Sequence, residues 1–147
     1  MAISAHDPQD RVEQLILLTD RLTELVAQAA QAFEQRRPQD AAIHVGETAR
    51  LANLYRHESA RVRANPELVA AAPLVLRTRL IRATEAFDAV LARQGRAIEA
   101  ARIITEGLVR AIADEVAVQR AKGLSYGPDA TTSTTGKATA ITLNQRA

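Results

Sequence analysis

The sequence predicts an all-α protein in which a helical hairpin packs on one long C-terminal helix, as in a bundle or coiled coil, followed by a disordered tail. Three observations lead to this fold class. Alanine is abundant, and valine, isoleucine and threonine form no alternating runs that could build a sheet. Hydrophobic residues make up 47% of the 147 residues, which is enough for a packed core. Residues 74–122 lack proline and carry apolar residues at spacings of three and four, as a long helix does.

The first helix is predicted at about residues 8–36. Asp7 can accept hydrogen bonds from the free amides of the first turn, and Pro8 suits the first helical position. Pro38 ends or kinks this helix, because its ring clashes with the preceding turn and it has no amide to donate.

A second helix is predicted at about residues 39–64, and a short one follows at about residues 66–72. Pro66 suits the first position of the short helix and Pro73 interrupts it, so the chain turns back between these two prolines.

The charges of the first two helices differ in sign. Residues 1–40 carry 4 arginines and 7 acidic residues, a net charge of −3. Residues 41–82 carry 7 arginines and 3 acidic residues, a net charge of +4. We therefore expect the acidic first helix and the basic second helix to pack antiparallel.

The long helix is predicted at residues 74–122, with Gly123 as its C-cap. Such a helix is about 70 Å long. It cannot bury its apolar stripe on itself, so another part of the chain or a partner must cover it. The polar Gln94 near its middle either fixes the register or marks where a packed partner ends. The stripe consists of Leu76, Leu80, Ala83, Phe87, Val90 or Leu91, Gln94, Ala97 or Ile98, Ala101, Ile104, Leu108, Ala111 or Ile112, Glu115 and Val118.

These helices define a bundle domain that covers residues 7–123. Residues 1–6 are expected to be flexible. Residues 124–147 are rich in threonine, serine and glycine, and they carry too few apolar groups to bury a core, so we expect them to be disordered.

The sequence offers no convincing catalytic or metal site. The three histidines, His6, His44 and His57, lack the glutamate three residues earlier that metal sites in helical bundles use. There is no cysteine, no glycine-rich phosphate loop and no nucleophile motif. A histidine phosphotransfer site at His44 is disfavoured, because Glu47 replaces the lysine and Thr48 the glycine that such sites carry. We expect no enzymatic activity, no cofactor and no metal.

Seven arginines bracket the prolines of the second turn: Arg50, Arg56, Arg61, Arg63, Arg77, Arg79 and Arg82. They would suit an anionic partner, but we favour a solvated face and expect no nucleic acid, because the net charge is only +2 and Tyr55 is the sole aromatic among them. The N-terminus has no signal-peptide pattern, and no run approaches the roughly 18 apolar residues of a membrane span. A cytoplasmic protein without membrane insertion is expected.

Three segments carry a resemblance to a known family. Residues 15–25 read Leu-Ile-Leu-Leu-Thr-Asp-Arg-Leu-Thr-Glu-Leu, residues 49–55 read Ala-Arg-Leu-Ala-Asn-Leu-Tyr, and residues 126–129 read Tyr-Gly-Pro-Asp. With the helix layout of residues 10–130, they resemble the FlgN-type flagellar export chaperones, in an alphaproteobacterial-like form. The resemblance implies a cytosolic, non-enzymatic chaperone that holds hook-associated proteins of the hook–filament junction and delivers them to the type III export gate. It places the client contacts on the second half of the long helix and the tail.

Five aliphatic side chains of the long helix are the expected client groove: Ile98, Ile104, Leu108, Ile112 and Val116. The same side chains would serve equally as an intramolecular core. Tyr126 is the expected accessory contact, or else a hydrophobic cap on the last helical turn. Two other functions stay open, namely a structural coiled-coil homodimer or adaptor with no export client and, less favoured, a histidine phosphotransfer-like bundle.

Overall fold

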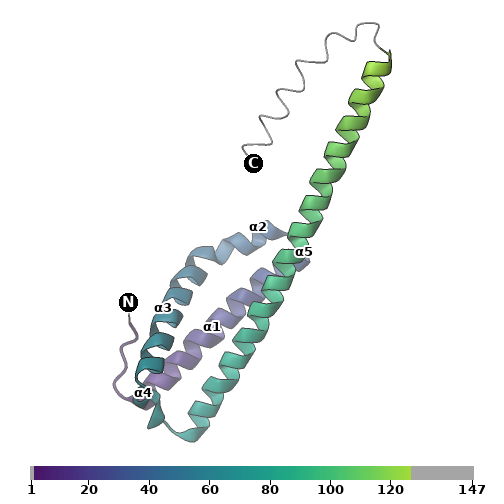
Figure 1. Cartoon of the computed structure of the whole chain (residues 1–147). Coiled ribbons are helices and arrows are strands. Elements are labelled where there is room, and N and C mark those ends of the chain that lie inside the picture. Colours follow the sequence, from purple (N-terminus) through teal and green to yellow (C-terminus); the bar gives the residue numbers. More distant parts are fainter. Residues whose placement is uncertain (1, 127–147) are drawn as a thin grey trace. The chain divides into compact units, whose positions relative to one another are not determined.

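The computed structural model describes residues 2–126, and every regular element in that range is a helix (Figure 1). The all-α class predicted from the sequence is therefore confirmed. The predicted disordered tail lies outside the described residues, except that residues 124–126 continue the last helix. The elements are α1 (Pro8–Glu34), α2 (Pro38–Ala41), the 3-10 turn η1 (Ala42–His44), α3 (Val45–Ala64), α4 (Glu67–Ala70) and α5 (Leu74–Tyr126).

The chain divides into two compact units, Met1–Ile103 and Ile104–Ala147. The first unit is a bundle in which α1 contacts α3 and α4, and in which buried side chains join α1 to the first part of α5. The described part of the second unit is the rest of α5, up to Tyr126.

The start of α1 is the one predicted from the sequence. Asp7 is the N-cap, and its Oδ1 accepts a hydrogen bond of 2.8 Å from the backbone N–H of Asp10. Pro8 occupies the first helical position, where its missing amide costs nothing. The helix ends at Glu34, slightly before the predicted residue 36, because Arg36 has a φ of 60° and no right-handed helix continues through that conformation.

A first core cluster joins the start of α1 to the start of α5. Val12 and Ile16 of α1 pack with the buried Ala72 in the turn after α4. Leu76 and Leu80, half-buried on α5, close this cluster. The long helix thus begins packing on α1 within its first turn.

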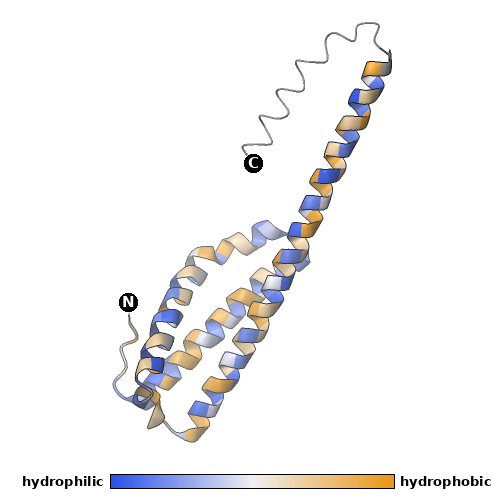
Figure 2. Ribbon diagram, in the orientation of Figure 1, coloured by the Kyte–Doolittle hydropathy of each residue, from blue (hydrophilic) through white to orange (hydrophobic). Residues whose placement is uncertain are grey.

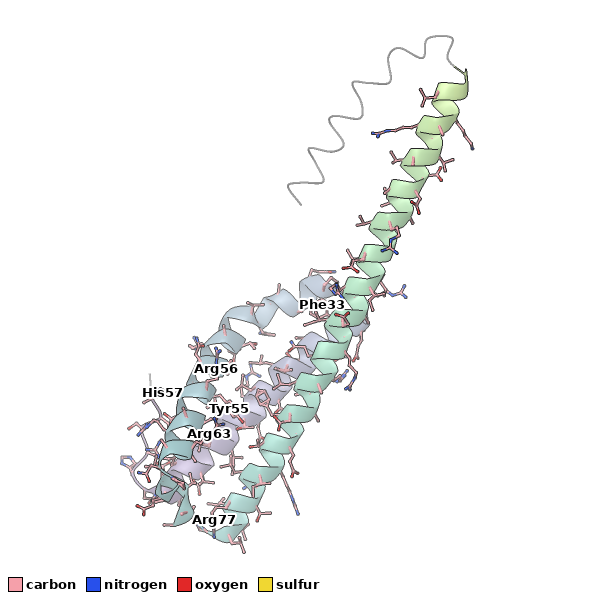
Figure 3. The ribbon with its side chains drawn as sticks, viewed as in Figure 1. Phe33, Tyr55, Arg56, His57, Arg63 and Arg77 are labelled. Atoms are coloured by element: carbon pink, nitrogen blue, oxygen red, sulfur yellow. The ribbon has the colours of Figure 1, made fainter. Side chains whose placement is uncertain are left out.

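A second core cluster joins all three long helices. Leu18 and Leu22 of α1 contact Phe87 of α5, which is only 6% exposed. Tyr55 of α3, labelled in Figure 3, packs on the same cluster. Its ring centroid lies 5.1 Å from that of Phe87, with the planes tilted by 54°. Tilted aromatic pairs at this distance add to the stabilisation from apolar burial alone.

The prediction of one helix over residues 39–64 is wrong in detail. The chain forms the short α2, passes through η1, and begins α3 only at Val45. Neither α2 nor η1 contributes a buried residue, and His44 has a φ of −109°, outside the helical range. Without a buried face, nothing holds this segment in register with α3.

α1 and α3 pack antiparallel, as predicted, but not for the predicted electrostatic reason. Arg11 near the start of α1 pairs with Glu58 near the end of α3 at 3.0 Å. Arg21, further along α1, pairs with Glu47 at the start of α3 at 2.9 Å. The interhelix ion pairs therefore join arginines of the acidic helix to glutamates of the basic helix, which reverses the expected pairing.

Glu58 is the most deeply buried charged residue of the described chain, with 0% of its surface exposed. Its carboxylate accepts hydrogen bonds from Arg11 at 3.0 Å, from Arg61 at 3.2 Å and from the backbone N–H of Ile3 at 2.9 Å. The Glu58 side chain therefore links α3 by hydrogen bonds both to α1 and to the N-terminal segment. Such a buried carboxylate is tolerated only because charged and hydrogen-bonding partners surround it.

α5 continues through Gly123 to Tyr126, so the predicted C-cap at Gly123 is wrong. No glycine among the described residues has the positive φ that a glycine cap needs. Gly123 is accommodated as an ordinary helical residue.

Gly95 lies inside α5, and a Cβ added there would meet no heavy atom within 4 Å. We expect Gly95→Ala to raise the free energy of unfolding by about 0.5–1 kcal/mol, because alanine loses less backbone entropy on helix formation. Urea denaturation followed by circular dichroism measures the change. Ala92→Gly, at an exposed site one turn earlier, is the matched control and should lower stability by a similar amount. A destabilised Gly95→Ala protein would contradict the open space around this glycine.

Candidate functional site

The face of α5 that packs in the bundle follows the predicted stripe. Ala83, Phe87 and Ala97 are buried. The stripe positions between and beside them are half-buried: Leu76, Leu80, Val90, Gln94 and Ala101. From Arg102 to Leu124 every residue is exposed. The 3–4 pattern of apolar residues therefore continues along α5 beyond the part that other helices of the bundle cover.

The five side chains predicted as a client groove all lie on the uncovered part of α5 or at its border, and we call them the exposed stripe. Their exposed fractions lie between 43% for Ile98 and 60% for Leu108. Figure 2 shows that apolar residues recur along α5 beyond the bundle portion of its sequence. None of the five belongs to a core cluster of the described chain. Their role in client binding stays a prediction. The exposed stripe consists of Ile98, Ile104, Leu108, Ile112 and Val116.

Tyr126, the predicted accessory contact, is the last residue of α5. Its side chain lies outside the described part of the structure, so its role as a partner contact or as a helix cap stays a prediction.

An apolar groove of about 450 Å³ opens in the first unit between the second half of α1, the α2–η1–α3 segment and Gln94 of α5. Phe33 forms part of its wall and is labelled in Figure 3. Val45, which lines the groove, is 59% exposed, and Ile43, two residues earlier in the chain, is 71% exposed. We call this the end groove. Its lining is Leu25, Gln28, Ala29, Phe33, Pro38, Asp40, Ala41, Ala42, His44, Val45, Thr48, Ala49, Ala52 and Gln94.

Two ion pairs hold the helices that form the end groove. Arg93 of α5 donates two hydrogen bonds to the carboxylate of Glu34, at 2.8 and 2.7 Å, and these lower the pKa of Glu34. Arg21 of α1 likewise donates two hydrogen bonds to the carboxylate of Glu47, at 2.9 and 3.1 Å, and these lower the pKa of Glu47. Both pairs are solvent-exposed, so they fix geometry more than they add stability.

The described residues contain no group of three or more histidine, cysteine, aspartate or glutamate side chains that could hold a metal ion. His44 lines the end groove with its Nδ1 4.0 Å from the carboxylate of Glu47. Within the described part of the chain, no helix has the length and apolar character needed to cross a lipid bilayer.

Comparison with known proteins identifies a close relative. The sequence is 62% identical to the flagellar basal-body protein FlbY of Caulobacter vibrioides, and the match covers the full length of both chains. The chain belongs to the FlbY family. It is therefore a flagellum-related protein, which confirms the flagellar part of the predicted resemblance. No model of a known protein family matches the sequence, and no solved structure matches it.

For this member of the FlbY family, the assignment as a FlgN-type export chaperone stays a prediction. The relative is described as a flagellar basal-body protein, a description that names no client.

Sequence reasoning missed two features of the molecule. The first is Glu58, although a signal was present, because it falls on the apolar stripe of α3 between Tyr55 and Val62. A charged residue at such a position requires a buried partner. The second is the end groove, which depends on the break at η1, and the local sequence from Ala42 to His44 carries no proline or glycine to mark that break.

Proposed function

We propose that this chain is a flagellar export chaperone that holds hook-associated proteins in the cytoplasm and delivers them to the export gate. Two observations support the proposal. The chain belongs to a flagellar family, and the apolar stripe of α5 continues well beyond the part that the bundle covers. Contiguous exposed apolar side chains of this kind typically mark a binding site for another protein.

The exposed stripe suits a helical client. Ile104, Leu108, Ile112 and Val116 follow one another at intervals of four residues, which forms a continuous ridge along one side of the helix. An amphipathic helix of a client can bury such a ridge by helix-in-groove packing. Each side chain would contribute roughly 1 kcal/mol, because about half of its surface is still open to water.

The charge pattern favours a different protein over a parallel pair of identical α5 helices. If the heptad register that places Leu80, Phe87 and Leu108 at a positions is continued, Glu115 and Lys122 also take a positions. In a parallel homodimer each would face its own copy, and like charges in a seam repel. The structural coiled-coil homodimer therefore remains the second candidate, supported only by the uncovered stripe itself.

The end groove and Tyr126 are proposed as accessory contacts for the client. Val45 and Phe33 are apolar side chains in the lining of the end groove that a client could contact. The proposal needs no catalytic group, and the protein acts by covering apolar client surface that would otherwise self-associate.

A strain whose only copy carries Leu108→Asp and Ile112→Asp should lose export of hook-associated proteins, with impaired swimming. Both side chains are exposed, at 60% and 56%, so the protein should still fold and accumulate. Immunoblots of the culture medium and of whole cells measure export and protein level together.

Ile103→Asp is the matched control for that strain, because Ile103 is 58% exposed on α5 but lies outside the exposed stripe. It should leave export normal. Normal export in the Leu108→Asp, Ile112→Asp strain at unchanged protein level would contradict the proposed chaperone role.

A further inference from the structure

The outward faces of α1 and α3 carry charges of opposite sign. Both glutamates of α3, Glu47 and Glu58, turn toward α1 and pair with its arginines. The arginines Arg50, Arg56 and Arg63 of α3 are left exposed; Arg56 and Arg63 are labelled in Figure 3. The outward face of α3 is therefore cationic along about 20 Å of helix.

The outward face of α1 is acidic and has an apolar residue at its centre. Glu13, Asp20 and Glu24 are exposed on it, and Leu17 among them is 69% exposed. Arg21 shares this face, but its guanidinium is already bonded to Glu47 and Glu24. This acidic face also spans a little under 20 Å of helix.

The two faces repeat one spacing, with carboxylates on α1 and nitrogen donors on α3. On α1, Glu13 and Asp20 stand four residues before and three residues after Leu17. On α3, Arg50 and His57 stand at the same offsets from Leu54, and this spacing puts each trio on one face of its helix.

The α3 trio surrounds a hollow that can receive an apolar side chain. Arg50, Asn53, Leu54 and His57 line a surface hollow of about 300 Å³. A cavity of about 150 Å³ holds a benzene molecule, so this hollow has room for a leucine side chain. The exposed Leu17 is the matching apolar projection.

We infer that a second copy of this chain binds here, with Leu17 of one copy entering the hollow at Leu54 of the other. Glu13 of the first copy then faces Arg50 of the second and can form an ion pair with it, and Asp20 faces His57, whose imidazole can donate a hydrogen bond to the carboxylate. A second copy is favoured as occupant because it supplies an exposed leucine flanked by two carboxylates at the spacing of Arg50 and His57 around the hollow. The net charge of +2 also leaves little repulsion between copies. This contact does not use the exposed stripe and does not depend on the proposed chaperone function.

Sedimentation equilibrium of the full-length protein tests the inference. The wild-type protein should self-associate, and more weakly at high salt because the contact is partly ionic. Leu17→Arg and Arg50→Glu should each weaken self-association at least about tenfold. The charge swap that combines Glu13→Arg with Arg50→Glu should restore it to within about threefold of the wild type, because the two charges still face each other across the contact.

Ile81→Arg is the control, since Ile81 is 59% exposed on α5 away from both faces. Repeating the series with Leu108→Asp and Ile112→Asp present removes any contribution of the exposed stripe. Circular dichroism checks that each variant is folded. A wild-type protein that stays monomeric would overturn the inference. This holds even if the protein binds an acidic peptide copied from residues 8–24, because the peptide is not a second copy of the chain. Equal association of wild type, Leu17→Arg and Arg50→Glu would also overturn it.

Discussion

Replacing Glu58 by alanine lowers the free energy of unfolding by about 3–5 kcal/mol, the range expected when one member of a buried ion pair is removed. Glu58 has no exposed surface, and Arg11, which it neutralises, has a side chain only 10% exposed. Removing the carboxylate leaves this guanidinium buried without a counter-charge. It also frees the backbone N–H of Ile3, so the N-terminal segment should lose its attachment. Chemical denaturation and proteolysis of the N-terminal residues measure the two effects.

Glu47→Ala is the matched control for this experiment. Glu47 also pairs with an arginine of α1, at 2.9 Å, but both side chains of that pair are partly exposed, at 42% and 31%. Its removal should cost less than about 1 kcal/mol, because water can solvate the arginine that remains. Similar losses for both variants would show that burial does not distinguish the two ion pairs.

Replacing Phe87 by alanine should cost about 3–5 kcal/mol, the usual price of truncating a buried aromatic residue. Its ring contacts Leu18 and Leu22 of α1 and pairs with Tyr55 of α3, so one substitution opens a cavity among all three long helices. Urea denaturation at a fixed protein concentration measures the loss.

Phe33→Ala is the control, since this chain has 2 phenylalanines and Phe33 is only half-buried in the wall of the end groove. Its substitution should cost clearly less than that of Phe87. A Phe87→Ala protein as stable as Phe33→Ala would contradict the packing of the second core cluster.

The sequence predicted the long elements because their signals are local and repeated. Asp7 and Pro8 define the start of α1 by capping alone. The predicted stripe of α5 contains its three buried side chains, Ala83, Phe87 and Ala97, the last as an alternative to Ile98, because they stand at a spacing that one helix face satisfies. The same stripe continues into residues that are exposed, such as Leu108.

The errors have a common physical cause, which is that tertiary contacts decide what local patterns leave open. The break at Ala42–His44 occurs in a segment with no buried residue, where no local signal separates a helix from a 3-10 turn. The direction of the ion pairs depends on which face of each helix is buried. Net charge summed over residues 1–40 and 41–82 gives the sign of each segment but not the side on which its charges lie.

The candidate site was predictable in its position along α5 but not in the residue at which it begins. The position of the exposed stripe follows from the length of the apolar pattern relative to the shorter helices that could cover it. The point at which cover ends, just after Ala101, depends on where α1 ends and on the interruption at η1. The end of α1 lies slightly before its predicted place, and the interruption at η1 was not predicted.

The central claim is that the exposed stripe of α5 binds a client, and light scattering coupled to size-exclusion chromatography tests it most directly. The protein is mixed with the C-terminal segment of a hook-associated protein, and the molar mass of each peak is measured. A stable mixed complex that disappears with Leu108→Asp and Ile112→Asp, but persists with Ile103→Asp and at unchanged helicity, is the predicted result. A wild-type protein that binds no client and runs as a tight homodimer, which the same two substitutions dissociate, would contradict it and assign the stripe to a structural coiled coil.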